Sequence, residues 1–243
     1  MKWNNKFTYP KSTRSIVNGS RHYNLDGSNL PSVTTILKAT QSEEDKAGIA
    51  AWKERVGHKE AERIKNEAAN RGSSMHSYIE QFLLGKFNLD LLDEDNKSKK
   101  MAVEIIDNGL KNKLSEIWGT EATVYYPGKY AGTADCIGIY EGKETILDFK
   151  QSNKPKKQEF ILDYLLQGSG YSLAHNTVYN SRITQVAILI CTVDGLFQDF
   201  KIEGNELINF QNLHCISSIE ACFTFLGLQI SMRSCTANWG AGK

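Results

Sequence analysis

Residues 129–150 read KYAGTADCIGIYEGKETILDFK and have the pattern of a β-hairpin. Its two halves are rich in β-branched and aromatic residues and flank the polar residues Glu141-Gly142-Lys143. Such halves are typical of strands, and a short polar stretch with glycine between them indicates an antiparallel hairpin. A similar segment, TEATVYYP at 120–127, precedes them and ends at another turn signal, Pro127-Gly128. The pattern therefore predicts three antiparallel strands in succession.

The predicted hairpin brings two acidic residues together. If residues 141–143 form the turn, antiparallel pairing places Asp135 opposite Phe149 and one step from Asp148. Because side chains alternate along a strand, Asp148 and Lys150 share one face, while Phe149 points to the other face, toward the core. Two carboxylates and one ammonium are thus expected on neighbouring strands.

These groups suit a metal site. Placing two carboxylates and an ammonium together is electrostatically unfavourable unless a cation joins them. Oxygen ligands favour Mg²⁺ or Mn²⁺ over zinc. The alternative is an ordinary Asp–Lys pair on a solvated strand face. A G-x-x-D pattern ending at Asp135 lies one hairpin arm before the D-x-K of residues 148–150 and at a consistent register, and this combination favours the metal site.

Composition indicates a folded protein with no global charge bias. The 243 residues carry 29 Lys and Arg against 28 Asp and Glu, so a site for a polyanion must be local. No apolar stretch is long enough to span a bilayer and the first residues lack a signal-peptide core, so we expect a cytoplasmic protein with no membrane partner. The five cysteines have no C-x-x-C spacing, which disfavours disulfides, a zinc knuckle and an iron–sulfur cluster. They are Cys136, Cys191, Cys215, Cys222 and Cys235.

The rest of the chain alternates between helical and strand-like patterns. The first half predicts a hairpin over 13–25, a helix after the cap Ser32, helices over 42–84 broken at Gly72 and Gly85, and a helix over 97–117. The second half adds a helix over 158–176, strands over 182–193 and 196–204, and a helix over 205–228.

This order favours a single α/β (α+β) domain over 1–243. It would comprise a mostly helical part at 1–117, a catalytic core at 118–230 and a flexible tail at 231–243.

Two further motifs place polar residues four apart on predicted helices. His76 and Glu80 share one face of the first, in RGSSMHSYIE, and Gln167 and Tyr171 share one face of the second, in QGSGY. Each motif alone is weak evidence for a functional site. A histidine on a helix, for example, is more often structural than a metal ligand.

Taken in order, R-G-x-x-x-H-x-x-x-E, G-x-x-D, D-x-K and Q-x-x-x-Y resemble the RecB-like branch of the PD-(D/E)XK nuclease superfamily. The likeness is closer to the mitochondrial genome maintenance exonuclease type and its phage relatives. It rests on LPSVTTIL (30–37), AANRGSSMHSYIEQFL (68–83), the G-x-x-D strand and LDFKQSNKPKKQEFILDYLLQGSGY (147–171). The resemblance implies a restriction-endonuclease-like core, a mixed central sheet flanked by helices.

The resemblance also implies roles for individual residues. Mg²⁺ or Mn²⁺ would be bound by His76, Asp135, Asp148 and the Phe149 carbonyl, and Lys150 would be the catalytic lysine. Gln167 and Tyr171 would position the DNA backbone or the active-site side chains. Glu80 would either hold His76 or Arg71 or have a purely structural role. One departure is Gln151, where many relatives have a hydroxyl residue.

The resemblance implies a DNA exonuclease that prefers single strands or free ends. Lys154, Lys156 and Lys157 in the loop after the site could guide a phosphate backbone, or could serve only solubility. Candidate stacking or channel residues are Trp118, Tyr125, Tyr126, Tyr130, Lys46, Lys53 and Arg55. A structure-specific endonuclease and a non-catalytic nucleic-acid-binding module remain alternatives. The polarity of cleavage is not predictable.

Overall fold

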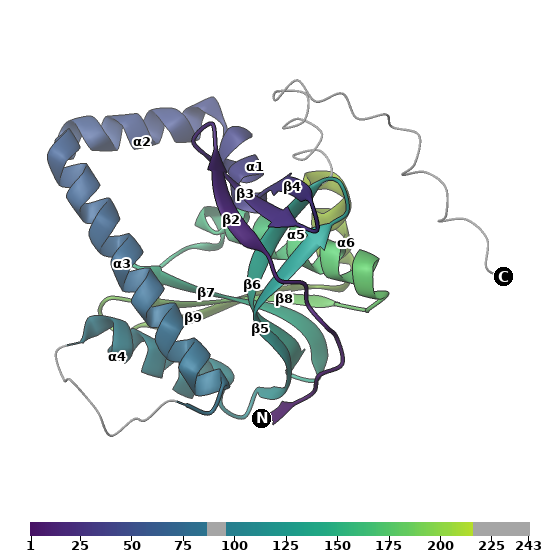
Figure 1. Ribbon diagram of the computed structural model, residues 1–243. Coiled ribbons are helices and arrows are strands. Elements are labelled where there is room, and N and C mark those ends of the chain that lie inside the picture. The colour runs from purple at the N-terminus through teal and green to yellow at the C-terminus, as the bar shows by residue number, and fades with distance from the viewer. Residues whose placement is uncertain (87–95, 216–243) are drawn as a thin grey trace.

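The computed structural model describes residues 1–86 and 96–215, and its centre is a mixed six-stranded sheet (Figure 1). The strand order is β1-β5-β6-β7-β8-β9. The strands are β1 (Lys2–Trp3), β5 (Leu114–Tyr126), β6 (Tyr130–Tyr140), β7 (Lys143–Ser152), β8 (Gln185–Thr192) and β9 (Phe197–Glu203). The predicted α/β class with a central mixed sheet flanked by helices is confirmed.

Strands β5, β6 and β7 form the predicted antiparallel meander, but the β6–β7 turn is shorter than expected. Glu141 and Gly142 both have positive φ, 49° and 81°, as in a two-residue mirror-image turn. Tyr140 therefore pairs with Lys143. The predicted register was wrong by one residue, because the turn contains two residues and not three. Continuing the observed register places Asp135 beside Asp148.

Strands β6 and β7 separate just where these two acids lie. Their last paired residues are Cys136 and Leu147, although both strands continue beyond them. Over the same residues β7 stays paired with β8, in parallel, as far as Ser152 and Thr192. The sheet thus opens on one side of β7, next to Asp135 and Asp148.

Helices cover both faces of the sheet (Figure 1). One face packs against α3 (His58–Leu83) and α4 (Lys97–Glu104), and the other against α1 (Val33–Ala39) and α5 (Leu162–Tyr179). Every residue of β8 is buried, as expected for a strand covered on both sides. The opening between β6 and β7 is therefore reached by side chains from both layers.

The N-terminal part contains the predicted hairpin and capped helix. The hairpin is formed by β2 (Thr13–Val17) and β3 (Ser20–Leu25), and β4 (Ser28–Pro31) adds an unpredicted third strand to this small sheet. Ser32 caps α1 by accepting a hydrogen bond from the Thr35 backbone N–H at 3.0 Å. Helix α2 (Glu43–Val56) then leads to α3, and the two helices arch around one side of the molecule (Figure 1).

Some predicted helix boundaries were wrong. The break in 42–84 falls at Gly57, which has a φ of 87°, whereas Gly72 lies within α3. A Cβ at Gly72 would lie 3.5 Å from the Gln151 side chain on β7, an ordinary contact distance, so the packing there does not require glycine. Gly85, with a φ of 68°, follows the end of α3 as expected.

The helix predicted over 97–117 comprises only α4 and the π-helical segment η1 (Ile105–Leu110). Residues from Leu114 onward belong to β5, because Leu114, Ile117 and Trp118 have a spacing that suits a helix but are buried from a strand. The proposed boundary at 117 therefore falls inside a strand. That residues 1–243 form one domain stays a prediction.

The C-terminal half follows the predicted order through β9. The predicted helix over 205–228 is a short α6 (Gly204–Asn209) followed by the π-helical segment η3 (Phe210–Cys215). Its remainder and the predicted tail at 231–243 lie outside the described residues. Cys136 and Cys191 are buried free thiols. Within the described chain, no helix is both long and apolar enough to cross a membrane.

Gly132, the glycine of the G-x-x-D pattern, lies under an α5 side chain. A Cβ at Gly132 would come 2.3 Å from Cε1 of Tyr171, which is only 4% exposed. The pattern therefore needs glycine so that the Tyr171 ring can lie against β6.

We expect Gly132→Ala to destabilise the protein by about 1–3 kcal/mol, because overpacking must displace a buried aromatic ring. Urea unfolding measures the change. The matched control is Gly48→Ala in α2, where a Cβ meets nothing within 4 Å and should stabilise the helix by up to about 1 kcal/mol. A Gly132→Ala protein as stable as the unmodified chain would contradict this packing.

Candidate metal centre

Asp135 lies at the opening of the sheet, and its carboxylate takes over a main-chain interaction there. Its Oδ2 accepts a hydrogen bond from the Phe149 backbone N–H at 2.7 Å, just beyond the last β6–β7 pair. A buried N–H group needs an acceptor, and here the carboxylate supplies it in place of a strand carbonyl. The Asp135 side chain, which comes from β6, is thereby held in a fixed orientation against β7.

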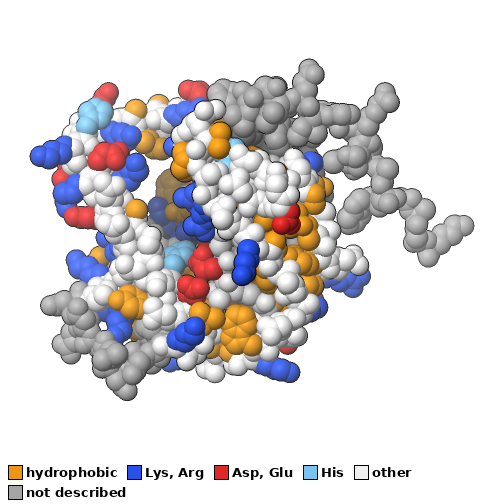
Figure 2. All heavy atoms as spheres, viewed as in Figure 1, with side chains coloured by type: hydrophobic (Ala, Val, Ile, Leu, Met, Phe, Trp, Pro, Cys, Tyr) orange, Lys and Arg blue, Asp and Glu red, His pale blue; other side chains and the backbone are white. Residues whose placement is uncertain are grey.

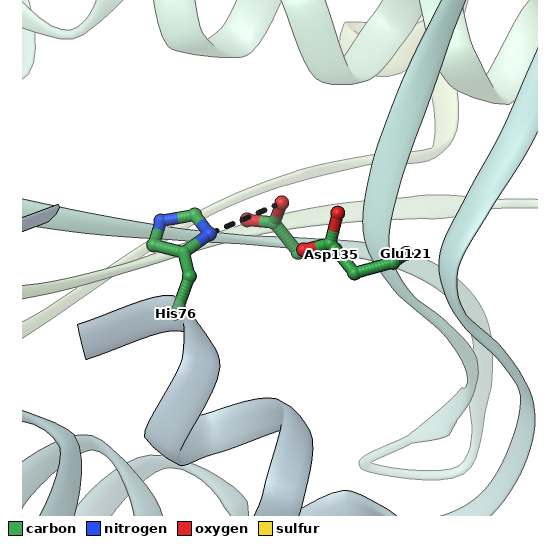
Figure 3. Close-up of side chains that lie close together, drawn as sticks. All are labelled: His76, Glu121 and Asp135. Atoms are coloured by element: carbon green, nitrogen blue, oxygen red, sulfur yellow. Dashed lines mark ion pairs between the residues drawn. The ribbon is translucent and has the colours of Figure 1, made fainter. Parts of the chain in front are cut away.

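His76 approaches Asp135 from the α3 side (Figure 3). Met75, Ile79 and Leu83 anchor α3 in the core beneath the sheet, which leaves the neighbouring His76 at the edge of that core. Its Nδ1 lies 3.5 Å from Asp135 Oδ1. The helical residue and the strand residue, far apart in sequence, are thus brought together as predicted.

Asp148 and Lys150 form a close ion pair on β7. Lys150 Nζ lies 2.5 Å from Asp148 Oδ2, and the two side chains are 20% and 2% exposed. Asp148 is thus almost fully buried, with Gln167 of α5 against it, whereas Lys150 is partly exposed. The ammonium of Lys150 also lies 5.2 Å from the centre of the Tyr164 ring.

Helix α5 presents Gln167 and Tyr171 to the same carboxylate. Gln167 Nε2 donates to Asp148 Oδ1 at 3.3 Å and to the Tyr171 hydroxyl at 3.1 Å. The i, i+4 spacing of Gln167 and Tyr171, which alone is a weak signal, lets the Gln167 amide hydrogen-bond to both the Tyr171 hydroxyl and the Asp148 carboxylate. The structure brings together His76, Asp135, Asp148, Lys150, Gln167 and Tyr171.

The buried charges shift one another's titration. Burial raises the pKa of Asp148 to about 6, more than the nearby Lys150 lowers it. Burial acts in the same direction on Asp135, but the charge and hydrogen bond of His76 outweigh it and lower the pKa of that carboxyl. Burial would lower the pKa of His76, yet Asp135 raises it to about 9. Opposite charges also raise the pKa of Lys150 despite burial. A cation bound among these carboxylates would favour their ionised forms.

The donor set fits a hard divalent cation. Asp148 Oδ2 is buried and pairs with the Lys150 ammonium, but it accepts no hydrogen bond from the residues described. Carboxylate oxygens with one imidazole suit Mg²⁺ or Mn²⁺, which are completed by water and substrate oxygens. The Phe149 carbonyl remains a predicted ligand, and the N–H of the same residue binds Asp135.

The sequence reasoning missed Glu121. His76, Glu121 and Asp135 each offer one ligand atom, and these atoms all lie within 4.8 Å of one another (Figure 3). The Pro127-Gly128 turn could have revealed Glu121, because this turn sets the β5–β6 register by pairing Tyr126 with Tyr130. Following that register along the strands would have brought Glu121 next to Asp135.

Arg71 and Glu80 have different surroundings from those implied by the resemblance. Arg71 donates from Nε to Gln151 Oε1 at 2.9 Å, and it also contacts Asn153 Oδ1. It thereby ties α3 to the end of β7. The Glu80 side chain forms no hydrogen bond or ion pair with residues 1–86 or 96–215, but its charge contributes to a raised pKa of Glu121.

Hydrogen bonds anchor the backbone of the basic loop after β7 at Lys154, through Ser152, and at Lys156. The Lys156 backbone N–H donates to Gln198 Oε1 at 2.8 Å, and its carbonyl accepts from Gln198 Nε2 at 2.9 Å. Lys154 and Lys157 are exposed, and Lys157 lies 3.8 Å from Glu159. The loop therefore offers cationic side chains to solvent on a fixed backbone.

The aromatic candidates divide by burial. Trp118 and Tyr130 are 3% and 0% exposed and belong to the core, whereas Tyr125 and Tyr126 are partly exposed.

Lys46, Lys53 and Arg55 lie on α2. Figure 2 shows a hollow in this face, with histidine and acidic side chains at its rim and lysine or arginine side chains around it.

Comparison with known proteins gives relatives of one kind. No family model matches the chain. It is 28% identical over 174 residues to mitochondrial genome maintenance exonuclease 1 of Homo sapiens, covering 68% of this chain and 50% of that protein. For the Mus musculus protein of the same name the identity is 28% over 179 residues, covering 70% and 52%.

Two solved structures are also similar. A presumed exonuclease from Eubacterium rectale has a TM-score of 0.42 and 16% identity, covering 66% of this chain and 69% of that one. An alkaline exonuclease from Laribacter hongkongensis has a TM-score of 0.32 and 11% identity, covering 63% and 81%. Over about two thirds of its length the chain is similar in sequence to vertebrate proteins named as exonucleases, and it spans about half of their length.

Proposed function

We propose that this protein is a metal-dependent DNA exonuclease that hydrolyses phosphodiester bonds. The observation that carries the proposal is the convergence of Asp135, Asp148 and Lys150 where β6 and β7 separate, with His76 3.5 Å from Asp135. The sequence similarity to proteins named as exonucleases supports the same activity. The resemblance of the ordered motifs to the RecB-like branch of the PD-(D/E)XK nucleases points to the same chemistry.

His76, Asp135, Asp148 and the Phe149 carbonyl would hold Mg²⁺ or Mn²⁺. A bound ion lowers the pKa of a coordinated water and neutralises charge on the phosphate. The protein's part is to fix the donors. Asp135 is held by the Phe149 N–H, and Asp148 is held by Gln167. Both carboxylates are therefore oriented by groups on β7 and α5.

Lys150 would place its ammonium beside the phosphate under attack, where it can orient water or stabilise developing negative charge. The Lys150 side chain is partly exposed, whereas that of Asp148 is almost fully buried, so the ammonium can be reached from solvent. Tyr164 lies against that ammonium, and Tyr171 supports Gln167. Tyr164, Gln167 and Tyr171 thus form one supporting stripe of α5.

The substrate would be single-stranded DNA or a free DNA end. Lys154, Lys156 and Lys157 leave the site on an anchored loop and can contact a phosphate backbone. The basic side chains around the hollow in Figure 2 suit the same polyanion. We place the activity in DNA replication, recombination or repair in a cytoplasm, which would be the host's for a phage protein.

We expect Lys150→Ala and Asp148→Asn to lower cleavage of linear single-stranded DNA in Mg²⁺ or Mn²⁺ by about 100- to 10,000-fold, because each removes a group that acts at the reacting phosphate. Gel assays of end-labelled DNA measure the loss. Thermal unfolding must accompany them, since breaking a buried ion pair changes stability as well. Full activity in either folded variant would rule out the proposed site.

Linear and covalently closed circular single strands separate the exonuclease from an endonuclease that uses the same residues. We expect metal-dependent degradation of the linear strand and survival of the circle under identical conditions, since an exonuclease needs a terminus. Rapid nicking of circles would identify an endonuclease. Binding of both substrates without cleavage, in either metal, would identify a non-catalytic nucleic-acid-binding module.

A further inference from the structure

Glu121 belongs to the same opening of the sheet but has no role in the proposed site. Thr120 pairs with Cys136 and Ala122 with Ala134, so Glu121 lies across from Asp135. Its φ of 47° marks an irregular point in β5. Ala122 is buried in the core on the α5 side, and Glu121 points the other way, toward His76 on α3 (Figure 3).

Three side chains that can bind a metal converge from three elements. His76 comes from α3, Glu121 from β5 and Asp135 from β6, and their ligand atoms lie within 4.8 Å of one another (Figure 3). Adjacent ligands of an octahedral Mg²⁺ or Mn²⁺ are about 3 Å apart, given bonds of about 2.1 Å. The His76–Asp135 distance of 3.5 Å is close to this value. A ligand atom of the exposed Glu121 lies within 4.8 Å of those of His76 and Asp135, so a side-chain movement that shortens these distances would close the set.

The side chain of Glu121 is free to make that movement. It forms no hydrogen bond or ion pair with any other residue in 1–86 or 96–215, and it is exposed. By contrast, Asp135 and Asp148 are fixed by their contacts with β7 and α5. Glu121 therefore has a carboxylate available for a ligand at little conformational cost.

The surrounding charge favours a cation at this point. Glu121 faces the like charges of Asp135 and Glu80, which are opposed by the positive charges of His76 and Arg14. Lys150 is paired with Asp148. The nearest strong positive charge on β7 is therefore already engaged, and a divalent ion beside Glu121 would offset the carboxylate repulsion.

We propose that Glu121 is a further ligand of the divalent cation, acting together with His76 and Asp135. The proposal rests on the proposed function, because it concerns the same metal centre. It adds a ligand from β5 to a set otherwise supplied by α3, β6 and β7. It also explains why an exposed acid is placed opposite Asp135, where it would otherwise only repel it.

Titration of the full chain with Mn²⁺, with free Mn²⁺ followed by electron paramagnetic resonance, tests the assignment without a cleavage readout. We expect Glu121→Gln to weaken Mn²⁺ binding at least about 10-fold. Glu80→Gln is the matched control, because it removes a neighbouring charge that Glu121 senses but no ligand atom of the cluster. It should change the affinity by less than about 3-fold, because the charge that it removes acts on the ion only through space.

The possible outcomes separate this inference from the function on which it rests. Unchanged binding in Glu121→Gln, with binding lost in Asp135→Asn, would overturn the role of Glu121 and leave the metal centre intact. Equal weakening by Glu80→Gln and Glu121→Gln would also overturn it, because charge alone would explain both. Absence of Mn²⁺ binding by the unmodified chain would overturn the metal-dependent function itself.

Discussion

The separation of β6 from β7 beyond the Cys136–Leu147 pair is the constraint on which the candidate site depends. A continuous ladder would satisfy the Phe149 N–H with a β6 carbonyl and close the sheet. Instead, the Asp135 carboxylate accepts that hydrogen bond, so one side chain both completes the edge of β7 and enters the site. Because the sheet is open there, His76 from one helical layer and Gln167 from the other reach the same pair of acids.

Burial gives this arrangement its chemical character. Asp148 is almost fully covered and Lys150 is mostly covered, so their interaction is screened less than that of a surface pair. The opposing shifts of the two aspartates follow from different partners, since His76 stabilises the charge of Asp135 while burial dominates at Asp148. Paired acids with divergent pKa values are typical of functional sites. A divalent cation would bring both to the ionised state.

Much of this was predictable from local patterns, and the failures have identifiable physical causes. The meander, the first hairpin and the Ser32 cap follow from residue types and turns that act over a few positions. The predicted β6–β7 register was wrong because Glu141 adopts a positive φ and the turn therefore contains only two residues. The helix prediction was wrong for residues 114–117 because the spacing of their apolar side chains suits both a helix and a buried strand. The motif residues were found by order along the chain, whereas Glu121 required the β5–β6 register to be followed across the sheet.

The most direct test is an anomalous diffraction measurement on crystals of this protein soaked in Mn²⁺. If Asp135 and Asp148 share a divalent ion, a peak will lie about 2.2 Å from an oxygen of each carboxylate. A Mn²⁺ peak found only elsewhere on the molecule, with both carboxylates unligated, would contradict the account.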